Sequence, residues 1–157
     1  MNWLTRTISK VFPKKKKSLD IPEESWQRCP QCQTMHYHTD LENNLMVCHN
    51  CDFHFKINPY LRFKTLFDNG AFEEVEYDTD FNDPLKFKDL RTYKDRWHEA
   101  RAKSGSKEVM VIGVGSINGV KTCVCSMNWF FMGASVGLSG AEGLIAAAEK
   151  SCEENIP

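Results

Sequence analysis

The 157-residue sequence has no long hydrophobic run and almost no excess of either charge. No stretch approaches the roughly eighteen apolar residues that span a bilayer, and the first residues lack the apolar segment and small-residue cleavage site of a secretory signal. The formal net charge of -1 gives no general attraction to nucleic acid or to membranes. We therefore expect a cytoplasmic protein that does not bind membranes, with the globular composition of 41% hydrophobic and 26% charged residues.

Charge is nevertheless distributed unevenly along the chain. Residues 1–20 carry six basic residues against one acidic residue, whereas residues 68–83 carry seven acidic residues and no basic one. The run from Lys14 to Lys17 repels itself, so residues 1–24 are expected to form a basic, flexible tail. Such a run can also contact phosphates, although it lacks the interleaved aromatic residues of a stacking surface. A nucleic-acid-binding module therefore stays open as an alternative function.

Four of the seven cysteines form two Cys-x-x-Cys pairs that are separated by fifteen residues. Two residues between thiols let both sulfurs turn toward one point, and two such pairs supply the tetrahedral ligands of a structural zinc ion. So short a segment cannot bury enough apolar surface to order itself, and the metal acts as its core. The spacing predicts a zinc ribbon over residues 25–57, with one structural Zn²⁺ bound by Cys29, Cys32, Cys48 and Cys51.

Other uses of these cysteines are less well supported by the sequence. A redox Cys-x-x-Cys normally stands alone beside a strand-helix-strand pattern, and a disulfide framework needs an oxidising compartment. Four thiolates close the zinc shell and leave no open position for catalysis at the metal. The nearby histidines are therefore expected to be solvated or to hydrogen-bond the ligands: His36, His38, His49 and His54.

Residues 58–105 are predicted to form a helical connector region. Asn58-Pro59 is a helix start and Asp68-Asn69-Gly70 a helix stop, so a helix is expected over residues 59–68. Its shared face is expected to be buried and consists of Phe63, Leu66 and Phe67. The acidic stretch 73–83 shows no clear helical or strand period and is interpreted as a loop.

A second helix is predicted over residues 89–103, with Ser104-Gly105 as its stop. Its expected apolar stripe consists of Leu90, Tyr93, Trp97 and Ala100. The opposite face is basic, and it is either solvated or available to the phosphates of a cofactor.

Residues 106–157 have the order strand, strand, glycine loop, helix. Two apolar runs, 109–115 and 120–127, flank Asn118-Gly119, a strong hairpin signal because both central residues of a type I′ turn need positive φ. The first run is nearly all apolar, so both of its faces require cover. The helix is expected over residues 141–154, with an inward face of Leu144, Ile145, Ala148 and Cys152. One hairpin with one helix cannot cover both faces, which predicts the incomplete front part of a larger α/β protein or completion by another subunit.

The glycine loop carries no recognisable catalytic motif. It lacks the Gly-Lys-Ser/Thr ending of a phosphate-binding loop and the spacing of a dinucleotide fingerprint. Ser135 lies near no histidine arranged as a base, and its surroundings do not match Gly-x-Ser-x-Gly. No catalytic residue is therefore assigned.

Taken in order, these features resemble the N-terminal portion of the beta subunit of bacterial acetyl-CoA carboxylase carboxyltransferase. The resemblance is carried by the four cysteines, by Asn118-Gly119, and by the segments 83–87, 93–96, 100–105 and 131–137. It implies an α/β (α+β) architecture, in which the zinc ribbon precedes the beginning of a crotonase-like strand-strand-helix fold over residues 106–157.

The resemblance also implies an activity and a set of partners. The family's enzyme transfers a carboxyl group from carboxybiotin on a biotin carboxyl carrier protein to acetyl-CoA, which yields malonyl-CoA for fatty-acid biosynthesis. It works as an α2β2 heterotetramer with the carboxyltransferase alpha subunit, and a biotin carboxylase loads the biotin with ATP. The chain is thus expected to be a carboxyltransferase component.

The resemblance implies that one loop forms a wall of the acyl-CoA pocket. This loop consists of Phe131, Met132, Gly133, Ala134 and Ser135. The family's main oxyanion glycines lie in a later Gly-Gly-Ala-Arg motif that this sequence does not contain. The chain alone is therefore expected to be inactive, which leaves an inactive structural partner as a further alternative. The sequence departs from the family at Asn128, Phe130 and Ala134, where an acidic residue, alanine and glycine are common.

Overall fold

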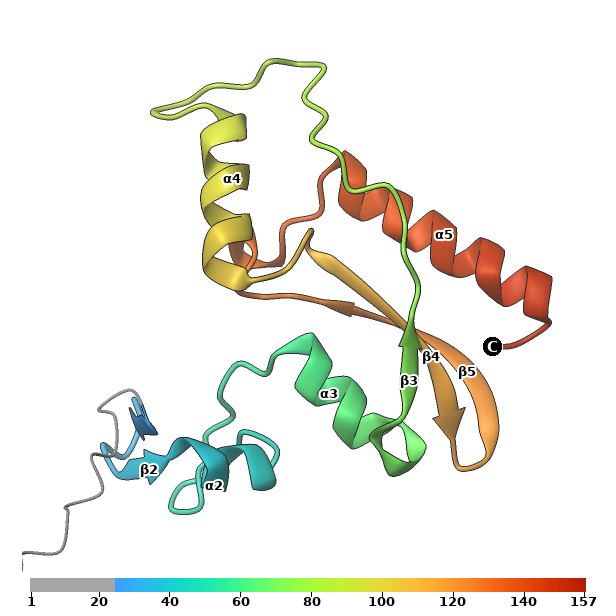
Figure 1. The fold of residues 1–157 in the computed structure, drawn as a ribbon. Helices are drawn as coiled ribbons and strands as arrows, with labels where there is room; N and C mark the ends of the chain where they lie inside the picture. Colours follow the sequence, from blue (N-terminus) through green and yellow to red (C-terminus); the bar gives the residue numbers. More distant parts are fainter. Residues whose placement is uncertain (1–24) are drawn as a thin grey trace, which may run out of the picture.

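The computed structural model describes residues 25–157, so the tail predicted for residues 1–24 lies outside the described residues. Figure 1 shows the zinc-ribbon segment at one end of the chain, followed by a small sheet with helices around it. No helix of residues 25–157 combines the length and apolarity needed to cross a bilayer. The elements are β1 Trp26–Arg28, β2 Met35–Tyr37, α2 His38–Asn43, α3 Pro59–Leu66, the 3-10 turn η2 Asp68–Gly70, β3 Phe72–Glu74, α4 Tyr93–Ser104, β4 Met110–Ile117, β5 Val120–Met127, the 3-10 turn η3 Met132–Ala134 and α5 Leu138–Glu154.

Strand β4 is the centre of a three-stranded antiparallel sheet with the order β3-β4-β5. It pairs with β5 without interruption from Met110↔Met127 to Ile117↔Val120. The predicted tight turn between them is confirmed, because Asn118 has φ 51° and Gly119 has φ 79°.

The side chain of Asp68 in η2 holds this turn. Its two carboxylate oxygens accept hydrogen bonds from the backbone N–H groups of Asn118, at 3.0 Å, and Gly119, at 2.8 Å. The contact joins residues fifty positions apart in the chain and fixes the end of the hairpin to the end of α3.

Replacing Asp68 by alanine should lower the free energy of unfolding by about 1–2 kcal/mol, because both turn amides lose a charged acceptor at an exposed site. Urea unfolding measures this. Asp68→Asn keeps one oxygen and should lose about half as much, whereas equal stability of Asp68→Ala and the parent protein would contradict the bracing role.

The expectation that both faces of β4 are covered is confirmed, since Met110 to Val114 are all buried. One face belongs to a hydrophobic cluster of Trp97, Ala100, Val109, Met110, Ile112, Phe131 and Ala147. The other face is covered by a second cluster of Phe63, Phe67 and Val111. The cover on this second side comes from α3 and from Phe67 just after it, and not from the helix that follows the hairpin. The predicted division at residue 105 remains a prediction, and residues on both sides of it share the first cluster.

Helix α3 starts as predicted, with the Asn58 side chain accepting a hydrogen bond from the Tyr60 N–H at 2.8 Å. It ends at Leu66 rather than at residue 68, because Phe67 is extended, with φ -81° and ψ 146°. This change of direction turns Phe67 onto the sheet, where it is 3% exposed, and leaves Leu66 40% exposed. The prediction that Leu66 shares the buried face is therefore wrong.

The acidic stretch is not simply a loop, and this prediction is also corrected. Phe72–Glu74 forms β3, which pairs with β4, and the Val75 N–H continues the ladder to the Ile112 carbonyl at 3.0 Å. Val75, Tyr77 and Phe81 pack on the first cluster, while the acidic residues between them face solvent. Burial, followed by the charge of Glu108, raises the pKa of Tyr77, so the phenol stays protonated and donates to the Met110 carbonyl at 2.7 Å.

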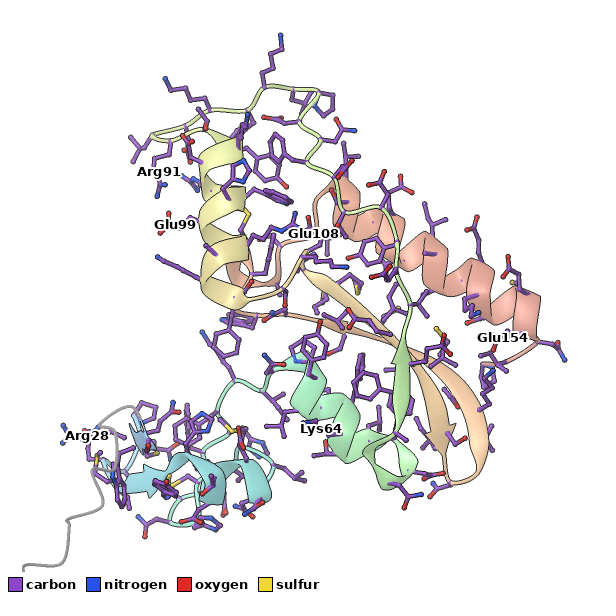
Figure 2. The ribbon with its side chains drawn as sticks, viewed as in Figure 1. Arg28, Lys64, Arg91, Glu99, Glu108 and Glu154 are labelled. Atoms are coloured by element: carbon purple, nitrogen blue, oxygen red, sulfur yellow. The ribbon has the colours of Figure 1, made fainter. Side chains whose placement is uncertain are left out.

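Helix α4 begins at Tyr93, four residues later than predicted, because Thr92 caps it by accepting from the Asp95 N–H. Leu90 precedes the cap and is 95% exposed, so its assignment to the buried stripe is wrong. Trp97 is buried as predicted and donates through Nε1 to the buried Glu108 carboxylate at 2.7 Å. Figure 2 shows Glu108 between α4 and the sheet. The predicted stop at Gly105 is confirmed by its left-handed φ of 67°.

Helix α5 begins at Leu138, three residues earlier than predicted, and its inward face is made of small residues. The buried positions are Ser139, Gly140, Gly143 and Ala147. The inward face predicted from apolarity is wrong, since the four residues assigned to it, Leu144, Ile145, Ala148 and Cys152, are exposed. The reason is close approach to the sheet: a Cβ at Gly140 would lie 2.6 Å from Val109 Cγ1, so only a small residue fits there.

Candidate functional site

The two Cys-x-x-Cys pairs form matching backbone turns. In the first, the Cys29 N–H donates to the Thr34 carbonyl and the Gln33 N–H donates to the Cys29 carbonyl, both at 2.9 Å. The second turn repeats both bonds at equivalent positions, through Cys48, Asp52 and Phe53. Gln33 and Asp52 both have positive φ, of 64° and 58°, which reverses the chain after each pair. Each turn therefore presents two sulfurs on one side.

The four sulfurs meet at one point. All lie within 4.8 Å of one another, and the Cys29–Cys51 and Cys32–Cys48 sulfurs are each 3.6 Å apart. A tetrahedral zinc ion with bonds of about 2.3 Å places its sulfur ligands about 3.8 Å apart. The arrangement of these thiols therefore fits a zinc ion, and the segment has the zinc-ribbon fold that the spacing predicts.

The thiols also have the electrostatics of a cation site. Hydrogen bonding to Thr34 lowers the pKa of Cys32 to about 5, whereas burial raises the pKa of Cys51 to about 12. Four thiols so close together cannot all ionise without a positive charge between them. Zn²⁺ supplies that charge, since it binds cysteine as thiolate.

One of the four nearby histidines contacts a predicted ligand. His36 is 7% exposed, and its Nε2 lies 3.1 Å from Cys48 Sγ. The Asn50 backbone N–H also points to this sulfur, at 3.4 Å. Such donors stabilise a metal-bound thiolate and fix its orientation. His38, in contrast, lies 3.3 Å from Glu42 in an exposed pair.

A second candidate site lies between α4 and the loop after β5. Here a groove of about 470 Å³ is lined from α4 by Arg96, Glu99, Ala100 and Lys103, and from the loop by Phe130, Met132, Gly133 and Ser135. We call it the α4 groove. Three of the five residues predicted to bind substrate line it: Met132, Gly133 and Ser135. Phe131 instead is 1% exposed in the hydrophobic core beneath the loop, and Ala134 is absent from the lining.

Asn128 fixes this loop, a role that sequence reasoning missed. It is fully buried, its Nδ2 donates to Ser106 Oγ at 2.6 Å, and its Oδ1 accepts from the Phe130 N–H at 3.0 Å. Its own N–H donates to the Val109 carbonyl at 2.7 Å. The sequence marked Asn128 only as a departure from a family pattern, which carries no signal of these contacts.

The loop turns with three successive residues of positive φ, at 46° for Met132 and 64° for both Gly133 and Ala134. The N–H groups of Ala134 and Ser135 donate to carbonyls within the loop, at 2.9 and 3.3 Å, so neither is free to bind an oxyanion.

Replacing Ala134 by glycine should stabilise the protein by up to about 1 kcal/mol, because removing the Cβ relieves left-handed strain that exceeds the entropy cost of glycine. Thermal unfolding of the zinc-loaded protein measures the change. Ala148→Gly in the exposed interior of α5 is the matched control and should destabilise by about 1 kcal/mol. A loss of stability in both variants would contradict the strain argument.

The rim of the groove carries ion pairs rather than unpartnered charge. Glu99 is bound by Arg91, at 2.6 Å, and by Lys103, and Arg96 contacts Asp89. Figure 2 shows Arg91 and Glu99 side by side at α4. Hydrogen bonds from Lys103 and Arg91 lower the pKa of Glu99 to about 2. Two bases of the face predicted for this helix, Arg96 and Lys103, are thus paired with carboxylates.

Because its pKa in the folded protein lies below the ordinary 4.5, Glu99 should contribute to stability above about pH 4.5 and lose that contribution as pH falls toward about 2. Carboxyl-carbon NMR should give a Glu99 midpoint near 2. The double change Arg91→Gln with Lys103→Gln should return it toward 4.5. Lys107→Gln, which removes a partner of Glu76 instead, should leave it unchanged. A midpoint insensitive to the double change would refute the assignment.

Comparison with known proteins connects both sites to one family. The profile described as the acetyl-CoA carboxylase zinc finger domain matches residues 26–51. The acetyl-coenzyme A carboxylase carboxyl transferase subunit beta of Dinoroseobacter shibae is 37% identical over 155 residues, which are 96% of this chain and 47% of that protein. The subunit of the same name from Hirschia baltica is 40% identical over 98% of this chain and 44% of its own length. That of Rhizobium meliloti is 33% identical over 100% of this chain and 52% of its own length.

The matched region includes the ribbon, α4 and the loop of the α4 groove, and the predicted resemblance is confirmed over at least 96% of the chain. The chain spans about half the length of the curated relatives it matches. The chain is therefore similar in amino-acid sequence to about half the length of each of these beta subunits, and its residues 26–51 match the zinc finger domain of acetyl-CoA carboxylase.

Proposed function

We propose that this chain supplies the zinc ribbon and the first part of the crotonase-like domain of an acetyl-CoA carboxylase carboxyltransferase. The reaction moves the carboxyl group of carboxybiotin to the methyl carbon of acetyl-CoA and forms malonyl-CoA. The observation that carries the proposal is the match to relatives of this name over at least 96% of the chain. The sheet and α5 have the strand-strand-helix order of the predicted domain.

The α4 groove is the proposed acyl-CoA wall. Met132, Gly133 and Ser135 form one side of it, while Arg96 and Lys103 lie on the other. Phosphate oxygens of a coenzyme can replace the carboxylates of Asp89 and Glu99 as partners of these bases. The enolate step needs preorganised N–H donors, and among the described residues we assign none to that role.

The zinc ion is proposed to be structural. Cys29 and Cys48 are fully buried, and four thiolates leave no coordination position for a substrate. When bound, the metal supplies folding energy to the ribbon rather than Lewis-acid chemistry. His36 and the Asn50 N–H hold the Cys48 sulfur in place.

The partners follow from the reaction. We propose assembly with a carboxyltransferase alpha subunit and turnover of carboxybiotin on a carrier protein, which an ATP-dependent biotin carboxylase loads. We place the protein in the cytoplasm, where thiols of this kind stay reduced. The relatives reported above carry the transferase name, which supports this function over nucleic-acid binding.

A chimera tests the proposal directly. The region of the Hirschia baltica beta subunit that matches this chain is replaced by residues 1–157, and the chimera is purified with the alpha subunit of that organism. We expect biotin-dependent consumption of malonyl-CoA, and the unmodified subunit serves as the positive control. A chimera that assembles with the alpha subunit and binds zinc, yet transfers no carboxyl group, would show that this chain is not a functional beta-subunit segment.

A further inference from the structure

Two adjacent aromatic residues, Trp129 and Phe130, lie between the zinc ribbon and the α4 groove. Lys56, which follows the ribbon's second turn, places its Nζ 4.6 Å from the centre of the Trp129 ring. Phe130 lines the α4 groove, and it also lines two cavities of about 560 and 420 Å³ on the ribbon side. Phe130 thus separates the ribbon from the groove.

On the ribbon side, the contacts lead back to the predicted zinc ligands. Val47 and His54 form a β-bridge, and the Phe55 N–H donates to the Met46 carbonyl at 2.8 Å, so the segment that carries Lys56 is tied to the segment that ends at Cys48. The cavity of about 560 Å³ is lined on this side by Met46, Phe53, Phe55 and Lys56, among others. Loss of the metal would release these contacts, because the bridge depends on the folded second turn.

On the other side, the two aromatic residues are held to the loop. Asn128 before them and Phe131 after them are 0% and 1% exposed, and the Phe131 N–H donates to the Asn128 carbonyl at 3.0 Å. The backbone between these anchors is short and hydrogen-bonded. A displacement of Trp129 and Phe130 must therefore move the start of the loop that lines the α4 groove.

We propose that Trp129 and Phe130 are positioning residues through which the zinc-bound ribbon holds the loop 131–135 against the α4 groove. Zinc occupancy then controls the order of the groove wall. The inference rests on zinc binding by the ribbon and is independent of carboxyl transfer.

Amide hydrogen exchange of the whole chain tests this coupling. In the parent protein, removing zinc with a chelator should accelerate exchange of the Phe131, Ala134 and Ser135 amides by about tenfold, while the β4–β5 amides stay protected. In Trp129→Ala and Phe130→Ala, these loop amides should exchange fast even with zinc bound and should not respond to its removal. Lys56→Met should weaken the zinc response, and Lys56→Arg should restore it, since a guanidinium also binds the ring face.

Leu144→Ala is the control. Leu144 lies on α5 and is 46% exposed, close to the 50% of Trp129 and the 49% of Phe130. This variant should retain the full zinc response in the loop. The proposal is overturned if loop exchange in the parent protein does not depend on zinc, or if Phe130→Ala responds like the parent. It is also overturned if zinc removal accelerates the β4–β5 amides equally, because the ribbon would then act on the whole sheet. The chimera can transfer carboxyl groups in any of these cases, so failure here is distinct from failure of the proposed function.

Discussion

Replacing Cys48 by serine should abolish zinc binding and unfold residues 25–57. The ribbon buries few apolar side chains, chiefly Leu41 and Met46 beside the cysteines, so metal binding has to provide most of its stability. Structural zinc contributes about 10–16 kcal/mol in small sites near neutral pH, comparable to the whole stability of an ordinary domain. The change also removes the sulfur to which His36 and the Asn50 N–H point.

Elemental analysis and NMR of the ribbon amides measure this effect. The parent protein should hold about one zinc per chain, and Cys48→Ser should hold almost none, with collapsed dispersion of the ribbon amides. Cys152→Ser is the matched control, because Cys152 is exposed on α5 and lies outside the thiol cluster. Stoichiometric zinc and an ordered ribbon in Cys48→Ser would contradict the four-thiolate assignment.

Replacing Phe63 by alanine should destabilise the sheet by about 3–5 kcal/mol, the range for a fully buried phenylalanine. Its ring is 0% exposed between α3 and β4, and a Cβ added at Gly113 would lie 3.0 Å from it. The strand cannot move into the void, because it is hydrogen-bonded on both sides by β3 and β5. The cavity therefore stays open, and its full cost is expected.

Urea unfolding with saturating zinc, followed by near-UV circular dichroism, measures this loss. Leu66→Ala is the control on the same helix and should cost less than about 1 kcal/mol, because Leu66 is exposed. The pair distinguishes the observed fold from the sequence prediction, in which both residues share the buried face. Equal losses in the two variants would mean that α3 packs differently.

The features that the sequence predicts correctly depend on local chemistry. Asn58-Pro59 starts α3, Asn118-Gly119 makes the turn and Gly105 ends α4, since each of these needs only its own backbone geometry. Each Cys-x-x-Cys turn is equally local, because two residues between cysteines suffice to aim both sulfurs at one point. The meeting of the two turns is not local, and it was predicted from the spacing typical of a zinc site.

The features that the sequence misses depend on tertiary packing. The buried face of α5 is set by how closely the helix approaches the sheet, so glycine and alanine lie inward and Leu144 and Ile145 outward. In the acidic stretch, the apolar residues Val75, Tyr77 and Phe81 are spaced by even numbers of residues, as in a strand. The many carboxylates between them made this strand pattern hard to recognise. Asn128 shows no local signal, because its partner Ser106 lies twenty-two residues away.

The loop 131–135 illustrates both cases. Its location beside α4 could not be deduced from the sequence, because the groove exists only when α4 and the end of β5 meet. Its residues were chosen by resemblance to a family, and Met132, Gly133 and Ser135 do line the groove. Phe131 instead is 1% exposed in the core, because the turn closed by its N–H on the Asn128 carbonyl places it beneath the loop.

The central claim is that four thiolates bind zinc in the ribbon, and zinc X-ray absorption spectroscopy tests this most directly. Four sulfur ligands at about 2.3 Å, with no scattering from an imidazole ring, are predicted. His36 Nε2 lies only 3.1 Å from Cys48 Sγ, so a three-sulfur, one-nitrogen site is the nearest alternative. A spectrum with a nitrogen ligand in the first coordination shell, or purified protein without zinc, would contradict the account.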